Sequence, residues 1–412
     1  MAVVRPFAAV RPSPQYAEKV ISLPYDVMSR EEAKKMAAGN PYSFLHICRS
    51  EIDLPDEKDP YSPEVYEKAK SNIFQFIEEG VLIQEEQPML YIYRQTMDGR
   101  VQTGIVGCVS IDEYLNNVIK KHEFTRVEKE LDRINHFDVC NTNTEPVFLT
   151  HREDKRLRTI IEDWIKNNKA EYDFVTEDGI GHALWAVSDV SVLSTITNLF
   201  KEMDSLYIAD GHHRSASAVK VGLKRREENP TFTGDEEFNF FMAVLFPDED
   251  LKIFDYNRVV QDLNGLTDQE FMDKLKENFT LEAVQGPYVP EQKHHFGMFL
   301  SGKWYKLIAK PQIISNKDLI QSLDVSILQD NVLAPILGIT DPRADNRIDF
   351  VGGIRGLEEL ERRVSLDMKV AFALYPVLIG DLLDVSDQGL VMPPKSTWFE
   401  PKLGSGLFMH RL

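Results

Sequence analysis

Residues 206–218 read LYIADGHHRSASA. This stretch contains the most distinctive group of candidate site residues in the chain, and its pattern predicts the local fold that holds them. The apolar run 206–209 predicts a short strand, and Gly211 permits the tight turn that follows it. The small residues 215–218 favour a helix that packs closely beneath the turn. The stretch therefore predicts a strand, a turn and a helix, with His212 and its neighbours at the helix start.

This helix start has the features of an anion site. The first backbone amides of a helix lack helical partners and carry positive partial charge. His213 and Arg214 add cationic groups at the end of the helix where cations are unfavourable unless an anion is near. We therefore expect Gly211, His212, His213 and Arg214 to bind phosphate, with Arg214 forking onto it. The alternative is a structural turn in which Arg214 pairs with a buried carboxylate such as Asp210.

A second segment, residues 120–133, collects basic, acidic and hydroxyl side chains in a short part of an acidic chain. Glu123 lies beside His122, and this pair could serve as a general base or as metal ligands. The alternative is a salt-bridged helix face exposed to solvent, which is what such charge runs usually form. Composition alone favours this alternative.

A third segment, residues 391–402, contains three prolines, which exclude a regular helix and predict an ordered loop or extended arm. Its groups suited to phosphate or hydroxyl contacts are those of Lys395, Ser396 and Thr397. The alternative is a structural strap held in place by Trp398 and Phe399. The residues themselves do not decide between the two interpretations.

The composition of the 412-residue chain limits its partners. A net charge of −19 disfavours nonspecific binding to nucleic acid, which needs many Lys and Arg side chains, and docking on anionic membranes. Three widely spaced cysteines, Cys48, Cys108 and Cys140, predict reduced thiols rather than disulfides or a metal knuckle. We see no secretory signal and no apolar run that could span a bilayer, so we expect a cytoplasmic protein.

Helix and strand signals alternate irregularly along the chain, which favours an α+β fold over a doubly wound sheet. The capping box that begins at Ser29 predicts a helix start. Asp98 and Gly99 predict a hairpin turn between strands at 90–95 and 101–109.

Two proline-containing turns and one pair of histidines are interpreted as structural features rather than as functional sites. Residues 23–27 and 40–43 read as proline-containing turns, although either could line a pocket. His294 and His295 lie in a strand-like run, so their side chains should point to opposite faces and make a poor metal site.

Four motifs in this order resemble a bacterial and archaeal family catalogued as domain of unknown function ten-fifteen. They are LPYDV at 23–27, KHEFT at 121–125, IADGHHR at 208–214 and MPPKST at 392–397. The resemblance covers nearly the whole chain. It favours placing the second and third segments at the same site as the loop, although the family has no settled activity.

The loop also resembles, over a short stretch, the phosphate-binding box of the ParB and sulfiredoxin superfamily. That superfamily includes partition proteins that bind CTP, sulfiredoxins and free-serine kinases. Where sulfiredoxins carry a nucleophilic cysteine, this chain has His212, so sulfiredoxin chemistry is not carried over. The resemblance implies mixed sheets with a ParB-like phosphate-binding core in residues 1–262, and a second α+β region in residues 263–412 that ends in the proline-rich arm.

We therefore expect a nucleotide-dependent phosphotransferase that acts on a small metabolite, with serine or a relative implied only by the superfamily. The alternatives are a CTP- or ATP-binding regulatory switch without net chemistry, or a phosphohydrolase. The expected cofactors are Mg²⁺ and a nucleoside tri- or diphosphate. The expected partners are the nucleotide and a small-molecule substrate, and a homodimer is left open.

The expected site combines the three segments. Glu123, Asp210 and His122 are the catalytic candidates, with Glu123 or Asp210 as base or magnesium ligand. The residues expected to contact phosphate or nucleotide, besides those of the loop, are Lys121, Thr125, Arg126, Lys395, Ser396 and Thr397. No residue is assigned to a tightly bound metal such as zinc.

Overall fold

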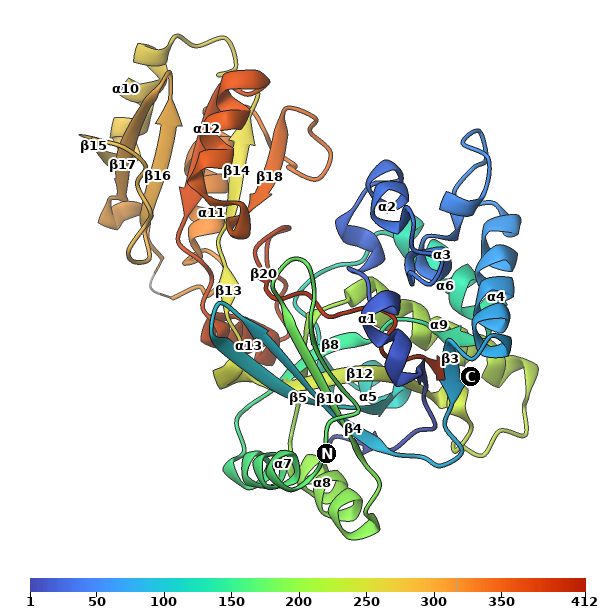
Figure 1. Cartoon of the computed structure of the whole chain (residues 1–412). Helices are drawn as coiled ribbons and strands as arrows, with labels where there is room; N and C mark the ends of the chain where they lie inside the picture. Colours follow the sequence, from blue (N-terminus) through green and yellow to red (C-terminus); the bar gives the residue numbers. More distant parts are fainter. Residues whose placement is uncertain (316) are drawn as a thin grey trace. The chain divides into compact units, whose positions relative to one another are not determined.

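The computed structural model describes residues 1–315 and 317–412 and confirms an α+β fold with mixed sheets (Figure 1). The chain forms two compact units, Met1–Leu251 with Pro401–Leu412, and Lys252–Glu400. This division differs from the regions drawn from the sequence, because it places residues 252–262 in the second unit and the last twelve residues in the first.

The first unit is built on a nine-stranded sheet. Its strands are β1 (Val4–Arg5), β4 (Leu90–Met97), β5 (Arg100–Ser110), β6 (Ile119–Lys120), β8 (Val147–His151), β9 (Tyr172–Val175), β10 (Gly181–Val187), β11 (Leu206–Asp210) and β12 (Phe240–Pro247). The order is β6-β11-β8-β12-β5-β4-β10-β9, with β1 beside β5. β6 pairs with β11 and β8 with β12 in parallel, whereas the other pairs are antiparallel.

Helices and two small ladders complete this unit. The helices are α1 (Ala17–Val20), α2 (Arg30–Ala37), α3 (Leu45–Cys48), α4 (Pro63–Glu78), α5 (Ile111–Leu115), α6 (Val127–Cys140), α7 (Lys155–Asn167), α8 (Val190–Glu202) and α9 (His212–Glu228). The ladders pair β2 (Val10–Pro12) with β3 (Leu82–Gln84), and β7 (Thr142–Asn143) with β21 (His410–Arg411). α6 packs against α9 and α4 against α6 (Figure 1).

Local signals in the sequence are confirmed in this unit. Ser29 and Glu32 form the predicted capping box at the start of α2. Asp98 and Gly99 turn the β4–β5 hairpin with φ of 51° and 77°, as a tight turn between antiparallel strands requires. Nearly every side chain of β12 is buried, because this central strand is covered on both faces of the sheet.

The second unit has a six-stranded antiparallel sheet in the order β15-β17-β16-β19-β14-β18. These strands are β14 (Tyr256–Val260), β15 (Phe279–Val284), β16 (His295–Leu300), β17 (Lys303–Ala309), β18 (Ile348–Gly352) and β19 (Val370–Leu374), and the helices are α10 (Asp268–Asn278), α11 (Asp324–Leu328), α12 (Gly356–Leu366) and α13 (Ile379–Asp387). β13 (Ile253–Phe254) pairs with β20 (Trp398–Phe399). His294 lies just outside β16 at a φ of 69°, so the two histidines do not share a strand.

The three cysteines are buried and free. Among the described residues, no helix has the length and apolar character needed to cross a membrane.

One buried acid of the first unit makes stability depend on pH. Glu113 on α5 is 8% exposed, and its Oε1 accepts a hydrogen bond from the Val3 amide at 2.7 Å. Burial raises the pKa of Glu113 from 4.5 to about 7, although this hydrogen bond lowers it. Because the folded state holds this proton more tightly, Glu113 should lower stability as the pH rises from 4.5 to 7.

We expect Glu113→Gln to remove this loss. Above pH 7 the variant should be more stable than the wild type by up to about 3 kcal/mol, and the difference should close near pH 4.5. Urea unfolding at a series of pH values measures it. Glu227→Gln, at an exposed position on α9, is the matched control and should leave the profile unchanged. A pH-independent difference for Glu113→Gln would contradict the assignment.

Candidate functional site

The predicted strand, turn and helix of residues 206–218 are present. β11 ends at Asp210, Gly211 turns the chain with φ of 92°, and the 17-residue helix α9 begins at His212. Because Gly211 has no side chain, it cannot cap the first amides of α9 with a side-chain oxygen. The start of α9 therefore keeps the anion-binding character expected from the sequence.

Two hydrogen-bond donors and a third, nearby cation hold Asp210 at this turn. Its Oδ1 accepts the Gly211 amide at 2.7 Å, and its Oδ2 lies 3.0 Å from Lys402 Nζ. Arg214 Nη2 lies 3.8 Å from Oδ1. Burial alone would raise the pKa of Asp210, but the charges of Lys402 and Arg214 outweigh it and hold this pKa well below its usual range. Asp210 is thus a carboxylate, and Lys402 joins the site as a residue that the sequence did not single out.

Arg214 lies inside the first unit. The residue is 2% exposed, and its Nη1 donates to the carbonyl oxygen of Pro146 at 2.6 Å. Burial lowers the pKa of Arg214, but the negative charges of Asp26, Asp210 and Glu145 raise it by more. These contacts are those of the structural alternative, in which Arg214 pairs with a buried carboxylate. The direct fork of Arg214 onto phosphate stays a prediction.

A buried charge cluster lies next to this arginine. Glu145 is 1% exposed, and its Oε1 accepts from the Tyr25 amide at 3.3 Å and from Ser405 Oγ at 2.8 Å. Arg133 Nη1 lies 3.6 Å from Glu145 Oε2, and its guanidinium carbon stands 4.0 Å from the centre of the Tyr25 ring. Arg133 is the last residue of the second segment but was not among the expected site residues, and Glu145 was missed, because neither position carries a local sign of burial.

A cavity of about 270 Å³ opens beside this cluster. The side chains that line it include Tyr25, Asp26, Arg30, Lys129, Asp132 and Arg133. The charge of Asp26, which lines the cavity, acts on both His213 and Arg214, so this wall of the cavity lies near the start of α9. Tyr25 and Asp26 belong to the LPYDV stretch, which forms the expected turn, a 3-10 helix at Tyr25–Val27, and also lines a pocket.

The second predicted segment lies at the start of α9. Residues 121–126 form the connection between β6 and α6. The Arg126 amide donates to His213 Nε2 at 2.9 Å, and the His122 amide lies 3.5 Å from His212 Nε2. Residues 121–126 are not helical, so they do not form the solvated helix face of the alternative. Residues 127–133 do begin helix α6, with Glu128 and Lys129 exposed.

Other side chains of this segment are engaged by neighbours. Thr125 Oγ1 donates to Glu130 Oε2 at 2.7 Å, and Lys121 Nζ stands 4.1 Å from the centre of the Tyr114 ring. Burial lowers the pKa of Lys121. Arg126 is exposed, so its guanidinium is accessible to a ligand at the start of α9.

The histidines of the site are held in the neutral form. Burial lowers the pKa of His122 to about 4, against the charge of Asp210 and a hydrogen bond to the backbone of Ile208. Burial and the neighbouring His122 hold the pKa of His212 well below its usual value. Burial also lowers the pKa of His213. At neutral pH these rings are hydrogen-bonding or metal-binding groups rather than cations.

Residues 391–400 of the third segment lie in the second unit, whereas Pro401 and Lys402 belong to the first. Lys395 has a φ of 58°, its carbonyl oxygen accepts from Arg258 Nη2 at 2.9 Å, and its Nζ stands 5.5 Å from the centre of the Tyr256 ring. Ser396 Oγ donates to the Pro393 carbonyl oxygen at 2.6 Å, and Thr397 directly precedes β20. The segment is the ordered loop expected from its prolines, and its role at the phosphate site stays a prediction.

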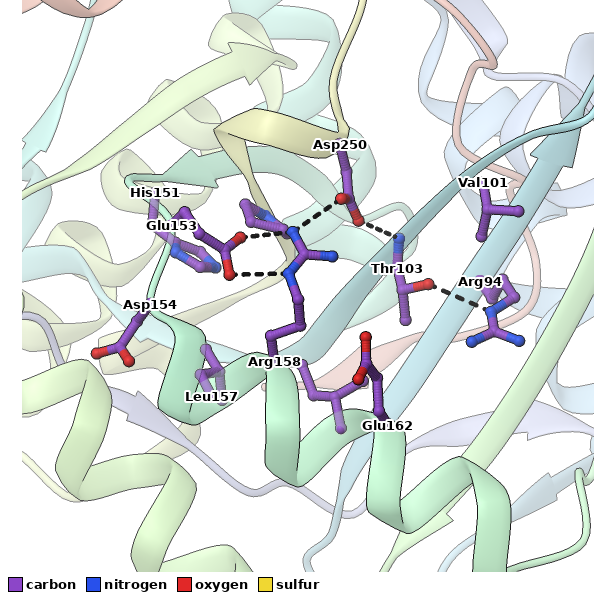
Figure 2. A pocket seen from close by; sticks show the side chains of 12 residues that line it. Arg94, Val101, Thr103, His151, Glu153, Asp154, Leu157, Arg158, Glu162 and Asp250 are labelled. Atoms are coloured by element: carbon purple, nitrogen blue, oxygen red, sulfur yellow. Dashed lines mark hydrogen bonds and ion pairs between the residues drawn. The ribbon is translucent and has the colours of Figure 1, made fainter.

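A second cavity of the first unit, about 170 Å³ in volume, contains none of the predicted site residues (Figure 2). Arg158 binds Glu153 and Asp250 there, and Asp250 accepts the Thr103 amide at 3.1 Å. Its carboxylates are Glu153, Asp154, Glu162 and Asp250. Because they outnumber its two arginines, this cavity does not suit an anionic ligand.

Comparison with known proteins places the chain in a family whose description names no activity. Residues 4–326 match the family model described as "Protein of unknown function (DUF1015)". No curated protein matches the chain. Similar solved structures include a free serine kinase in complex with AMP, at 14% identity over 73% of this chain and 92% of that chain, with a TM-score of 0.35.

Two further structures are similar at the same level. A conserved hypothetical protein from Pyrococcus furiosus is 13% identical over 74% of this chain and 94% of its own, with a TM-score of 0.34. SbnI from Staphylococcus aureus, with a C-terminal truncation, is 11% identical over 73% of this chain and 85% of its own, with a TM-score of 0.39. At these identities and scores, the three structures carry no argument about function.

Proposed function

This chain belongs to the DUF1015 family, and from the chemistry of its site we propose that it is a nucleotide-dependent phosphotransferase acting on a small metabolite. One observation carries the proposal: the first unit has an uncapped helix start beside a Lys–carboxylate pair, and the charge of Asp26 in a polar cavity acts on Arg214 at that helix start. Phosphoryl transfer requires mainly positioning and electrostatic stabilisation, which these groups supply.

In this proposal the phosphates bind at the start of α9. The first amides of α9 supply hydrogen-bond donors and positive partial charge. Arg126, which is exposed and whose amide contacts His213, supplies an accessible cation. Arg214 acts as a positioning residue, because its guanidinium is buried and donates to Pro146.

The two carboxylates take different roles. A general base works best when its pKa lies near the working pH, and Asp210 is far below that range. We therefore assign Asp210 to positioning Lys402 and Gly211, or to holding the Mg²⁺ that accompanies the nucleotide. Glu123 is the candidate base for the hydroxyl of the acceptor.

The cavity beside Tyr25 is the proposed acceptor pocket. Its volume of about 270 Å³ suits a small metabolite rather than a polymer. Asp26 and Lys129 both line it and offer opposite charges to a zwitterion. Serine or a related amino acid has both charges and a hydroxyl group, so this class is the first to test.

We expect nucleotides with Mg²⁺ to raise the melting temperature, since a ligand at a hundredfold its Kd adds about 2.7 kcal/mol to the unfolding free energy.

In calorimetric titration, Arg126→Ala should bind the best nucleotide roughly ten- to a hundredfold more weakly, because it removes a charge-assisted contact. Lys224→Ala, which removes an exposed cation further along α9, is the matched control and should bind normally.

A product assay with amino acids as acceptors separates the competing functions. A phosphorylated amino acid supports the phosphotransferase, and inorganic phosphate alone indicates a phosphohydrolase. Binding without any product indicates a regulatory switch. Equal affinity of Arg126→Ala and the wild type would contradict the placement of phosphate at α9.

A further inference from the structure

Three side chains with metal-binding atoms meet at the edge of the first unit's sheet. His122, Glu123 and His212 each present one ligand atom, and the three atoms lie within 4.8 Å of one another. The two histidine rings are 4.5 Å apart between centroids, at an interplanar angle of 88°. The proposed phosphotransferase does not require this grouping, and a magnesium ion held by carboxylates does not explain it.

The sheet topology accounts for the meeting of these residues. β6 and β11 pair in parallel, with Lys120 opposite Tyr207, so both strands end at the same edge of the sheet. His122 and Glu123 follow the end of β6, and His212 follows the end of β11. Because parallel neighbours carry their following residues to one edge, residues 90 positions apart come together.

The surroundings resemble those of metal-binding histidines. His122 is 2% exposed and His212 is 6% exposed, whereas Glu123 is partly exposed. A metal-ligating imidazole usually forms a further hydrogen bond to a carbonyl or carboxylate, which fixes the orientation of its ring. The contact between His122 and the backbone of Ile208 is of this kind.

We propose that His122, Glu123 and His212 bind a divalent transition-metal ion. Two imidazole nitrogens and one carboxylate suit zinc, manganese or iron better than magnesium or calcium, which prefer oxygen ligands. Ligands about 2.0–2.2 Å from one tetrahedral ion lie roughly 3.3–3.6 Å apart, so small side-chain rotations would bring these three atoms into coordination distance. Three protein ligands leave a position for water or for an anionic oxygen.

This assignment differs from the sequence-based expectation, which gave no residue to a tightly bound metal. The segment KHEFT and the loop DGHHR each contribute to the set, but neither has the spacing of a metal motif. The ion would be bound by the protein itself, separately from any magnesium that accompanies a nucleotide.

The test uses the whole purified chain, stripped with a chelator and titrated with Zn²⁺, Mn²⁺ or Mg²⁺ in the absence of nucleotide. We expect one equivalent of Zn²⁺ or Mn²⁺ to bind at least tenfold more tightly than Mg²⁺. Glu123→Gln and His212→Gln should each weaken this binding at least tenfold. His46→Gln is the matched control, since His46 also lies beside a carboxylate, at 2.7 Å from Asp53, and should leave binding unchanged.

A second readout guards against variants that fail to fold. Visible absorption of Co²⁺ bound to the wild-type chain should show mixed nitrogen and oxygen ligands, and Glu123→Gln, at a partly exposed position, should change that spectrum. Absence of stoichiometric binding of all these ions, or full binding by a folded Glu123→Gln variant, would overturn the metal site. Because nucleotide is absent, neither outcome tests nucleotide binding or transfer; a metal-bound Glu123 would not serve as the proposed base, and that role would then pass to another group.

Discussion

Arg214→Ala is expected to lower the free energy of unfolding by about 3–5 kcal/mol, the range for breaking a buried ion pair from one side. Arg214 is 2% exposed and lies 3.8 Å from Asp210, and its positive charge also acts on Glu145. Removing the guanidinium leaves buried carboxylates with less compensation and leaves the Pro146 carbonyl without its 2.6 Å donor. Urea unfolding followed by circular dichroism measures the loss.

Two further variants identify its cause. Arg214→Lys should recover part of the stability, because it restores the charge but not the planar donor geometry. Arg126→Ala removes an exposed arginine that precedes α6 and lies beside the start of α9. It should change the free energy of unfolding by no more than about 0.5 kcal/mol. If Arg214→Ala were as stable as the wild type, Arg214 would not be a structural partner, and the phosphate fork would become the better assignment.

Gly211→Ala is expected to destabilise the protein by roughly 2–4 kcal/mol, from backbone strain and from displacement of Arg214. Gly211 has a φ of 92°, which residues with a side chain rarely adopt. A Cβ at this position would stand 3.1 Å from Arg214 Nε and 3.2 Å from its Cζ, so the guanidinium would have to move. The same urea unfolding measurement applies.

Gly234→Ala separates the two contributions. Gly234 lies in the same unit at a φ of 101°, and a Cβ there would meet nothing within 4 Å. Its substitution should cost only the strain of the left-handed backbone, about 1–2 kcal/mol. If Gly211→Ala and Gly234→Ala lowered the free energy of unfolding equally, the Arg214 side chain would move aside at no energetic cost, and Gly211 would be needed only for the turn.

Local structure could be predicted wherever its cause is local. The capping box at Ser29, the hairpin turn at Asp98 and Gly99, and the strand–turn–helix of residues 206–218 each depend on hydrogen bonds and backbone preferences within a few residues. For the same reason, the prolines of residues 391–402 identified a loop before any tertiary contact was known. The family match confirms the resemblance that the four motifs indicated.

Helix lengths were predicted less well where packing decides them. The apolar pattern of residues 325–337 by itself predicts one helix, but α11 ends at Leu328 and a π-helical turn, Gln329–Leu333, follows it. The apolar pattern continues through both, so periodicity could not show that the backbone hydrogen bonds change partner. The position of the third segment relative to the loop was also beyond local reasoning, because residues 395–397 belong to the other compact unit.

The sequence by itself determined the strand–turn–helix with Gly211 at its turn, and it identified the family. Only the tertiary structure decided that Arg214 is buried against Pro146 and Asp210, that Lys402 pairs with Asp210, and that His122 meets His212. The physical reason is that each of these contacts joins segments that chain packing and strand order bring together. The parallel pairing of β6 with β11 depends on burial across the whole sheet, and no spacing within either motif encodes it.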